Sequence, residues 1–397
     1  MTAGLTNGTQ RTDVAIGRLS WHEARAAAFG AASALPLQRL PLADAIGRVL
    51  AEDVLALHDV PHYASSAMDG WAVCGDGPWR IVVGGIPLGD GTAAAIVTGG
   101  LIPSGTSGVL RRENAIVDRG VLTTESGEPS PGQHIRLPGR EALRHERVIA
   151  AGVTVNPAHV ALAAGCGYDT LAVFGRPRVA FVFTGDEVVE RGIPAPGMVR
   201  DSFGPQLPAL LRMFGAVPTS SRRVLDSLAD TVAAIGADSG ASEVVITTGG
   251  TGDSAVDHIR PALAELDARM LVDGIGMRPG GPTMLAQLPD GRYVVALPGN
   301  PLAAIMGVLT VVAPLIAGLA GRREPTLGSA INAEDLQGKN DPSVLMPYRL
   351  IAGEAVVDAW HGSAMMRGLA GADGVLVVPA GGAKKGDVVE TVALPWS

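Results

Sequence analysis

The sequence predicts a multidomain chain of the α/β plus β class, with a doubly wound α/β domain at its centre. Three observations lead to this prediction. The chain has 397 residues, which is more than one compact core usually holds. Apolar strand-like runs alternate with helical segments from residue 178 to residue 323, the pattern of a mostly parallel sheet. Short β-like runs separated by Gly and Pro lie before and after this region.

Changes of pattern along the chain divide it into five expected parts. In chain order they are a disordered N-terminus (1–17), a discontinuous helical/linker domain (18–58 and 141–177), an inserted small β domain (59–140), the central α/β domain (178–323) and a C-terminal β domain (324–397). Ser20 followed by Glu23 is the pattern of a capping box at a helix start. Residues 41–54 are interpreted as a second helix that runs into a strand, and residues 270–277 as one further strand.

Composition argues against several classes of protein. The net charge is −8 and no stripe of Lys and Arg is present, which argues against a nucleic-acid surface. Cys74 and Cys166 lie far apart, so neither a zinc site nor a disulfide framework is indicated, and a cytoplasmic protein is expected. The apolar stretch 302–321 is long enough to span a membrane, but it contains Pro314 and follows a strand-like run. We interpret it as a buried helix and expect no membrane association.

Polar and glycine-rich segments follow four strands of the expected α/β domain. They are Thr184–Glu187, the stretch ending at Asp226, the turn 247–254 with Asp257 beyond it, and Ala296–Pro301. Ligands of open α/β sheets bind at the carboxyl ends of the strands. All four segments are therefore expected to open onto one crevice.

The chemistry of these segments suits a phosphate and a divalent cation. Backbone N–H groups of the turn 247–254 can approach an oxyanion, although the turn is neither a P-loop nor a GxGxxG fingerprint. Glu187, Asp226 and Asp257 would repel that anion unless a cation lay between them, and ligands that are all oxygen favour Mg²⁺. Each acid taken alone is better explained as a solvated loop charge, but the convergence of three acids on one crevice favours function.

Taken together, these stretches resemble the molybdopterin molybdenumtransferase family (the MoeA and gephyrin E-domain family), from residue 20 to residue 394. The motifs that carry the resemblance are "DVPHYASSAMDGWAV", "VTGGLIPSG", "RVAFVFTGDEV", "VRDSFGPQL", "EVVITTGG", "RPGGP", "ALPGNP" and "HGS".

The resemblance implies Mg²⁺-dependent insertion of molybdate into adenylylated molybdopterin with release of AMP, by a homodimer whose active site is shared between subunits. The α/β domain would bind molybdopterin. The implied catalytic residues are Asp69, Glu187, Asp226 and Asp257, of which the last three would bind the metal. The implied substrate-binding residues are Ser66, Thr98, Thr184, Asp201, Gly249, Gly250, Thr251, Gly252, Arg278, Pro282, Pro298, Gly299, Asn300, Arg349 and Ser363. Asp69 is expected to reach the crevice of the other subunit.

Some positions depart from the family pattern. Gly281 stands where the family has a second lysine, and Ala303 where a serine helps to hold molybdate. These departures leave an alternative open, in which the chain is a non-catalytic or altered-specificity paralogue that binds molybdopterin or a partner protein. A generic sugar-phosphate or nucleotide enzyme would explain the crevice but not the ordered set of motifs.

Overall fold

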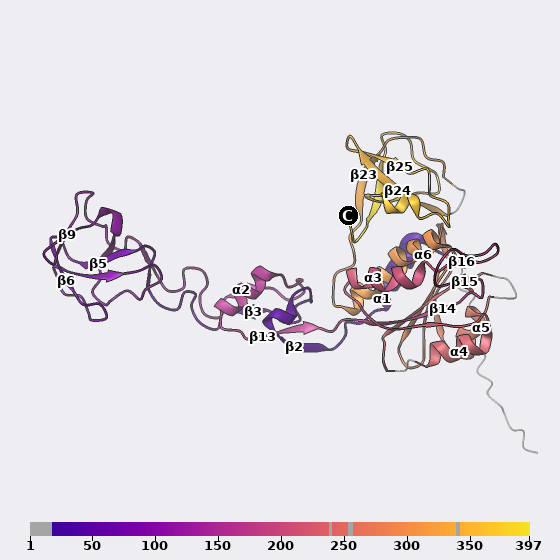
Figure 1. Cartoon of the computed structure of the whole chain (residues 1–397), viewed down its shortest axis with the longest axis horizontal. Helices are drawn as coiled ribbons and strands as arrows, with labels where there is room; N and C mark the ends of the chain where they lie inside the picture. The colour runs from indigo at the N-terminus through magenta and orange to yellow at the C-terminus, as the bar shows by residue number, and fades with distance from the viewer. Residues whose placement is uncertain (1–17, 238–239, 253–256, 339–341) are drawn as a thin grey trace, which may run out of the picture. The chain divides into compact units, whose positions relative to one another are not determined.

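A computed structural model describes residues 18–237, 240–252, 257–338 and 342–397 of the chain. The predicted disordered N-terminus, residues 1–17, lies outside this part. The chain divides into two compact units, one formed by the residues up to Leu37 together with Phe174–Ser397, the other by Gln38–Val173 (Figure 1).

The larger unit contains a six-stranded sheet in the order β17-β14-β18-β22-β21-β19. The strands are β14 (Arg178–Phe183), β17 (Val217–Arg223), β18 (Val244–Thr248), β19 (Arg269–Asp273), β21 (Met284–Gln287) and β22 (Tyr293–Leu297). β17, β14, β18 and β22 run parallel, whereas β21 is antiparallel to both of its neighbours. The predicted central α/β domain with a mostly parallel sheet is therefore confirmed.

Helices cover both faces of this sheet (Figure 1). They are α1 (Trp21–Ala31), α3 (Phe203–Met213), α4 (Leu228–Gly236), α5 (Ile259–Glu265), α6 (Pro301–Gly307) and α7 (Ala313–Leu319). Successive side chains of a strand point to opposite faces. Val179, Phe181 and Phe183 accordingly join a core with α1, α3, α6 and α7. Ala180 and Val182 face a second core beneath α4 and α5.

The long apolar stretch forms one continuous helix through the first of these cores. α6 passes into a π-helical segment, η3 (Val308–Val312), which continues into α7. By length and composition this helix could cross a membrane, yet its whole apolar window is buried inside the unit. The interpretation of the stretch as a buried core helix is confirmed.

α1 fixes this helix at its π-helical segment. The Trp21 indole donates to Thr310 Oγ1 at 3.0 Å. Arg25 is 3% exposed, and its guanidinium donates to the carbonyls of Leu309 at 3.0 Å and Pro325 at 2.9 Å. Pro314, five residues beyond Leu309, has no N–H to donate along the π-helical segment, and a buried carbonyl needs a donor. Arg25 supplies that donor.

The start of α1 carries the predicted capping box. The Ser20 hydroxyl accepts from the Glu23 amide at 3.3 Å, and the Glu23 carboxylate accepts from the Ser20 amide at 2.8 Å. α1 packs against η3 and α7 in the larger unit. Its partner was expected to be the linker segments, so the grouping differs from the one predicted from the sequence.

The C-terminal β domain is a closed barrel of five strands. They are β23 (Gly328–Asn332), β24 (Ser343–Ile351), β25 (Glu354–Val357), β26 (Gly374–Val378) and β27 (Val388–Ala393), and a short helix, α8 (Arg367–Ala370), precedes β26. β24 pairs with both β25 and β26, and β23 with both β25 and β27, while β26–β27 closes the ring. This confirms the predicted C-terminal β domain.

The expectation of a single strand at residues 270–277 is wrong. This stretch divides at Gly274, whose φ of +80° favours glycine, into β19 of the central sheet and β20 (Ile275–Arg278). β20 pairs in parallel with β24 of the barrel and with β1 (Leu19–Ser20). One run of chain thus belongs to two sheets.

The smaller unit carries the inserted β domain, a six-stranded sheet in the order β8-β5-β7-β6-β10-β9. Its strands are β5 (Gly70–Cys74), β6 (Trp79–Val82), β7 (Thr92–Ile96), β8 (Gly108–Arg111), β9 (Ile116–Asp118) and β10 (Val121–Thr123). The remaining elements are β2 (Leu37–Pro41), η1 (Leu42–Ala45), β3 (Val54–Leu55), β4 (Ser65–Ser66), η2 (Arg112–Asn114), β11 (Ile135–Arg136), β12 (Arg147–Ile149), α2 (Pro157–Gly165) and β13 (Thr170–Phe174).

The helix expected at residues 41–54 is wrong. Only the single 3-10 turn η1 forms, and Gly47 follows it with φ of +77°. Val49 and Leu50 are then buried as isolated bridges to Thr154 and Val173. Apolar spacing suited a helix, but non-local pairing decided the structure.

We predict that Arg25→Met lowers the free energy of unfolding of the larger unit by about 2–4 kcal/mol, because the buried Leu309 carbonyl loses its donor and the bond to the Pro325 carbonyl is also lost. The measurement is the denaturant midpoint. Arg269→Met is the matched control, since Arg269 is exposed and its bond to Gln287 Oε1, at 2.8 Å, lies at the surface. Equal midpoints for the two variants would contradict the role given to Arg25.

Candidate active site at the strand ends

A cavity of about 700 Å³ lies at the carboxyl ends of β14, β17, β18 and β22. This is the crevice that the strand-end rule predicts. The predicted site residues that line it are Thr184, Glu187, Asp201, Asp226, Gly249, Gly250, Thr251, Gly252, Asp257, Pro282, Pro298, Gly299 and Asn300. All four strand-end segments therefore meet at one place.

The glycine turn after β18 packs closely against the end of β14. The Thr184 hydroxyl donates to the Thr248 carbonyl at 2.9 Å. Gly249 has φ of +85°, and a Cβ there would lie 2.6 Å from Thr184 Oγ1. A Cβ on Gly252 would lie 2.9 Å from Asp257 Oδ2. The left-handed φ of Gly249 requires glycine there, and the bare backbone of the turn forms this wall of the cavity.

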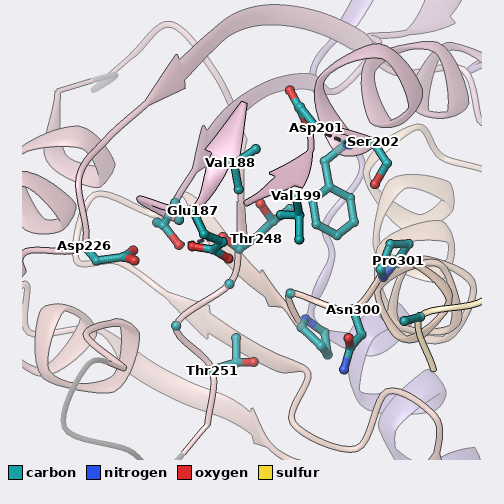
Figure 2. A pocket seen from close by; sticks show the side chains of 18 of the residues that line it. Glu187, Val188, Val199, Asp201, Ser202, Asp226, Thr248, Thr251, Asn300 and Pro301 are labelled. Atoms are coloured by element: carbon teal, nitrogen blue, oxygen red, sulfur yellow. Dashed lines mark hydrogen bonds between the residues drawn. The ribbon is translucent and has the colours of Figure 1, made fainter. Parts of the chain in front are cut away.

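The acidic side of the cavity is formed by Glu187, Asp226 and Asp257. Figure 2 shows the carboxylates of Glu187 and Asp226 in the same part of the cavity. The chain around Asp226 is held by reciprocal bonds with Asp186, in which each backbone amide donates to the other carboxylate at 3.2 and 3.3 Å. Among the described residues, no group of three or more His, Cys, Asp or Glu side chains is arranged to hold a metal ion. The three acids thus share a cavity without forming a closed ligand cluster.

The Asp201 side chain is fixed by two backbone amides and one guanidinium. Its carboxylate accepts from the first two amides of α3, those of Phe203 at 2.9 Å and Gly204 at 3.0 Å. It also pairs with the Arg223 guanidinium at 2.8 Å, and its side chain is 9% exposed. These contacts place the start of α3 beside the cavity, where two short strands, β15 (Val188–Val189) and β16 (Val199–Arg200), also line it.

A second cavity, of about 570 Å³, adjoins the first and shares Pro282, Pro298 and Asn300 with it. Its polar lining consists of Arg18, Arg278, His361, Ser363 and Asn300. Within the part of the chain that the structure describes, no carboxylate lines it. The two neighbouring cavities therefore differ in charge, the first acidic and the second basic.

Gly281 and Ala303 also line this second cavity. A Cβ on Gly281 would lie 3.0 Å from the Met277 carbonyl and 3.2 Å from that of Ile275, so the chain here packs on the backbone of β20. The Ala303 amide donates to the Ser363 carbonyl at 3.1 Å. The two departures from the family pattern thus occupy tightly packed positions.

Arg349, implied as a substrate contact, lines neither cavity. It lines a third one, of about 440 Å³, on the C-terminal barrel. There its guanidinium pairs with Asp358 Oδ2 at 2.8 Å. Sequence reasoning missed Asp358, although an acid directly after β25 and three residues before His361 was a usable signal.

The remaining predicted residues lie in the smaller unit. Asp69 Oδ1 accepts from the Thr98 amide at 2.7 Å, so these two residues are brought together. The Thr98 backbone amide, then its hydroxyl, and the charge of Arg112 hold the pKa of Asp69 below its usual value. The Ser66 hydroxyl donates to the Met68 carbonyl at 2.6 Å and shapes the same loop. None of the three lines either of the two adjoining cavities.

Three family models match consecutive parts of the chain. Residues 19–167 match the MoeA N-terminal region (domain I and II), residues 180–318 a probable molybdopterin binding domain, and residues 329–394 the MoeA C-terminal region (domain IV). Together the models span both units.

Whole proteins match over a similar length. A molybdopterin molybdenumtransferase of Nostoc sp. is 31% identical over 369 residues, which cover 84% of this chain and 83% of that protein. One from Staphylococcus epidermidis is 28% identical over 377 residues, covering 88% of this chain and 90% of that protein. The structure of a molybdopterin biosynthesis MoeA protein from Pyrococcus horikoshii shares the fold, with a TM-score of 0.80 at 23% identity over 95% of this chain and 99% of that one. The chain belongs to the MoeA family of molybdopterin molybdenumtransferases.

Proposed function

We propose that this chain acts in molybdenum cofactor biosynthesis by inserting molybdate into adenylylated molybdopterin, with Mg²⁺-dependent release of AMP. One observation carries the proposal: an acidic cavity with a glycine turn adjoins a basic cavity, and Pro282, Pro298 and Asn300 line both. The substrate would carry a phosphate anhydride at one end and the group that receives molybdenum at the other. The phosphate end would lie in the first cavity and the end that receives molybdenum in the second.

The first cavity suits the phosphate end. Backbone N–H groups of a glycine turn can contact phosphate oxygens. Mg²⁺ would be held by Glu187, Asp226 and Asp257, whose oxygen atoms belong to the ligand class it prefers. Mg²⁺ usually keeps several waters and takes further ligands from substrate phosphates, so an open arrangement of carboxylates fits it. When bound, it would neutralise charge on the phosphate being cleaved.

The second cavity suits the oxyanion. Arg278 supplies positive charge there and Ser363 a hydroxyl donor, and no carboxylate among its described lining residues opposes an anion. Ala303 brings no donor from its side chain, which favours an altered specificity or a weaker affinity for molybdate as the second candidate. Complementation of a transferase-deficient strain at ordinary molybdate levels would separate the two, since full rescue removes the second candidate.

The protein is further proposed to act in the cytoplasm as a homodimer, without nucleic-acid or membrane partners. The bonded pair Asp69 and Thr98 lies in the smaller unit, apart in sequence from the acids of the first cavity. In a homodimer, such a pair can complete the site of the other subunit. The lowered pKa of Asp69 keeps its carboxylate charged at pH values where an ordinary aspartate begins to be protonated.

Asp257→Ala is expected to lower AMP release by about 100-fold, because a charged group beside the reacting phosphate is lost. The measurement is AMP formed from adenylylated molybdopterin with Mg²⁺ and molybdate. Glu265→Ala, at the exposed end of α5, is the matched control and should retain activity. A large fall in thermal midpoint for Asp257→Ala alone would instead indicate a structural role.

Mixing inactive variants tests whether the site is shared. Asp69→Asn and Asp257→Ala subunits, allowed to exchange in equal amounts, should recover about a quarter of wild-type AMP release, since half the dimers then contain one intact site. Asp257→Ala mixed with Glu187→Gln should recover none, because both changes lie in the same unit. Recovery in neither mixture would argue against a site formed across subunits.

Ala303→Ser should lower the KM for molybdate by about tenfold, because a hydroxyl added at this wall can donate to a charged ligand. The measurement is AMP release as a function of molybdate concentration. An unchanged KM would indicate that this wall does not contact the oxyanion.

At the other departure from the family pattern, Gly281, we do not expect the family residue to be tolerated in the same way. Gly281→Lys is expected to lower the thermal midpoint, because its Cβ would press on the carbonyls of Met277 and Ile275. Gly381→Lys is its control, since a Cβ at Gly381 meets no atom within 4 Å.

A further inference from the structure

The loop that follows β25 contacts three cavities. His361 and Ser363 line the second cavity, and Ala364 lines the first. At the root of the same loop, Asp358 and Trp360 line the third cavity, beside Arg349. The position of this short segment therefore affects the shape of the candidate active site.

The root of the loop is held by a buried carboxylate. The Asp358 side chain is 6% exposed, and its Oδ2 pairs with Arg349 Nη2 at 2.8 Å. Its Oδ1 accepts from the Trp360 amide at 2.9 Å. The Asp358 carbonyl accepts from His361 Nδ1 at 2.7 Å, while its amide donates to the Pro347 carbonyl at 3.0 Å. Asp358 thus joins β24 to both the root and the middle of the loop.

Close packing and a second anchor complete the arrangement. A Cβ on Gly368 would lie 2.5 Å from the Trp360 carbonyl and 3.0 Å from Asp358 Oδ1, so α8 packs directly on the root. The Arg367 guanidinium lies over the Trp360 ring, 4.6 Å from its centroid. At the tip, the Ser363 carbonyl accepts from the Ala303 amide of α6.

The charge of Asp358 is maintained by its neighbours. The Trp360 amide, then the Arg349 guanidinium, hold its pKa below the usual value, and the charge of Arg367 acts in the same direction. Because the folded-state pKa is lowered, the ion pair is complete at neutral pH and is lost only as the pH falls through that lowered pKa. His361, the remaining titratable group at the loop, bonds to the Asp358 carbonyl and not to its carboxylate.

We propose that Asp358 is a positioning residue for the reaction proposed above, holding the loop so that His361 and Ser363 face the second cavity. Arg349 acts through Asp358, as its charge partner, and does not touch the oxyanion. The inference rests on the proposed function, because the second cavity is taken as the molybdate pocket. It accounts for why Arg349 lies outside the two adjoining cavities.

The first experiment removes the charge of the Asp358 side chain and keeps its shape. In Asp358→Asn, the new NH₂ group must face either the Arg349 guanidinium or the Trp360 amide, both of which are donors, so one of these bonds is lost together with the charge. The dissociation constant for molybdate, measured by equilibrium dialysis, should rise by about tenfold, while AMP affinity stays near wild type. Asp373→Asn is the matched control, since the exposed Asp373 carboxylate accepts one amide, that of Leu350 at 2.7 Å, on the same barrel. Wild-type molybdate affinity in Asp358→Asn would overturn the inference.

A double-mutant cycle separates the two roles open to Arg349. If it acts through Asp358, then Arg349→Gln, Asp358→Asn and the double variant should all weaken molybdate binding by the same factor. If Arg349 touches the oxyanion directly, the effects of the single variants should multiply in the double variant, and the inference fails.

Hydrogen exchange supplies a readout that does not depend on the reaction. The amides of Trp360 and Ala303 should exchange faster in Asp358→Asn than in Asp373→Asn, because both bond to the held loop. Unchanged exchange would overturn the inference even if molybdate binding fell. If the wild-type protein neither binds molybdate nor releases AMP, the proposed function fails, and exchange still decides whether Asp358 holds the loop.

Discussion

The contact between α1 and the π-helical segment of the long buried helix supports the rest of the larger unit. That helix begins at Pro301, directly after the residues that line both cavities. Its irregular segment would leave a buried carbonyl without a donor, and Arg25 supplies one. The helix cannot shift along its axis without breaking this bond. Arg25 therefore also fixes the position of Pro298 and Asn300, which precede the helix and line both cavities.

Close backbone packing, more than side-chain chemistry, shapes the candidate site. Gly249 is needed beside Thr184, and Gly281 beside the backbone of β20. Backbone peptide groups therefore form much of the cavity walls, and only a few side chains supply the charges that could bind a ligand. Replacing one of these glycines by a larger residue would change the packing of the backbone first and the contacts with a ligand second.

The sequence allowed the crevice to be predicted because the strand-end rule depends only on the order of strands and helices. Apart from the capping box of Ser20 and Glu23, it did not allow the partners of side chains to be predicted. Arg349 was expected beside the oxyanion, and only the structure shows that it pairs with Asp358. Residues 41–54 were misread because their apolar spacing suits a helix, while their burial depends on pairing with residues about a hundred positions away. Non-local contacts account for the error at residues 41–54, whereas the partner of Arg349 lies only nine residues away.

The division of one run of chain at Gly274 has a consequence for how the protein could have been assembled. β19 completes the central sheet, whereas β20 pairs with the barrel strand β24. The α/β domain and the barrel are therefore not interchangeable modules, although the chain visits them in sequence. Cutting the chain after the long helix would leave β20 without β24 and expose an unpaired strand edge, which promotes aggregation.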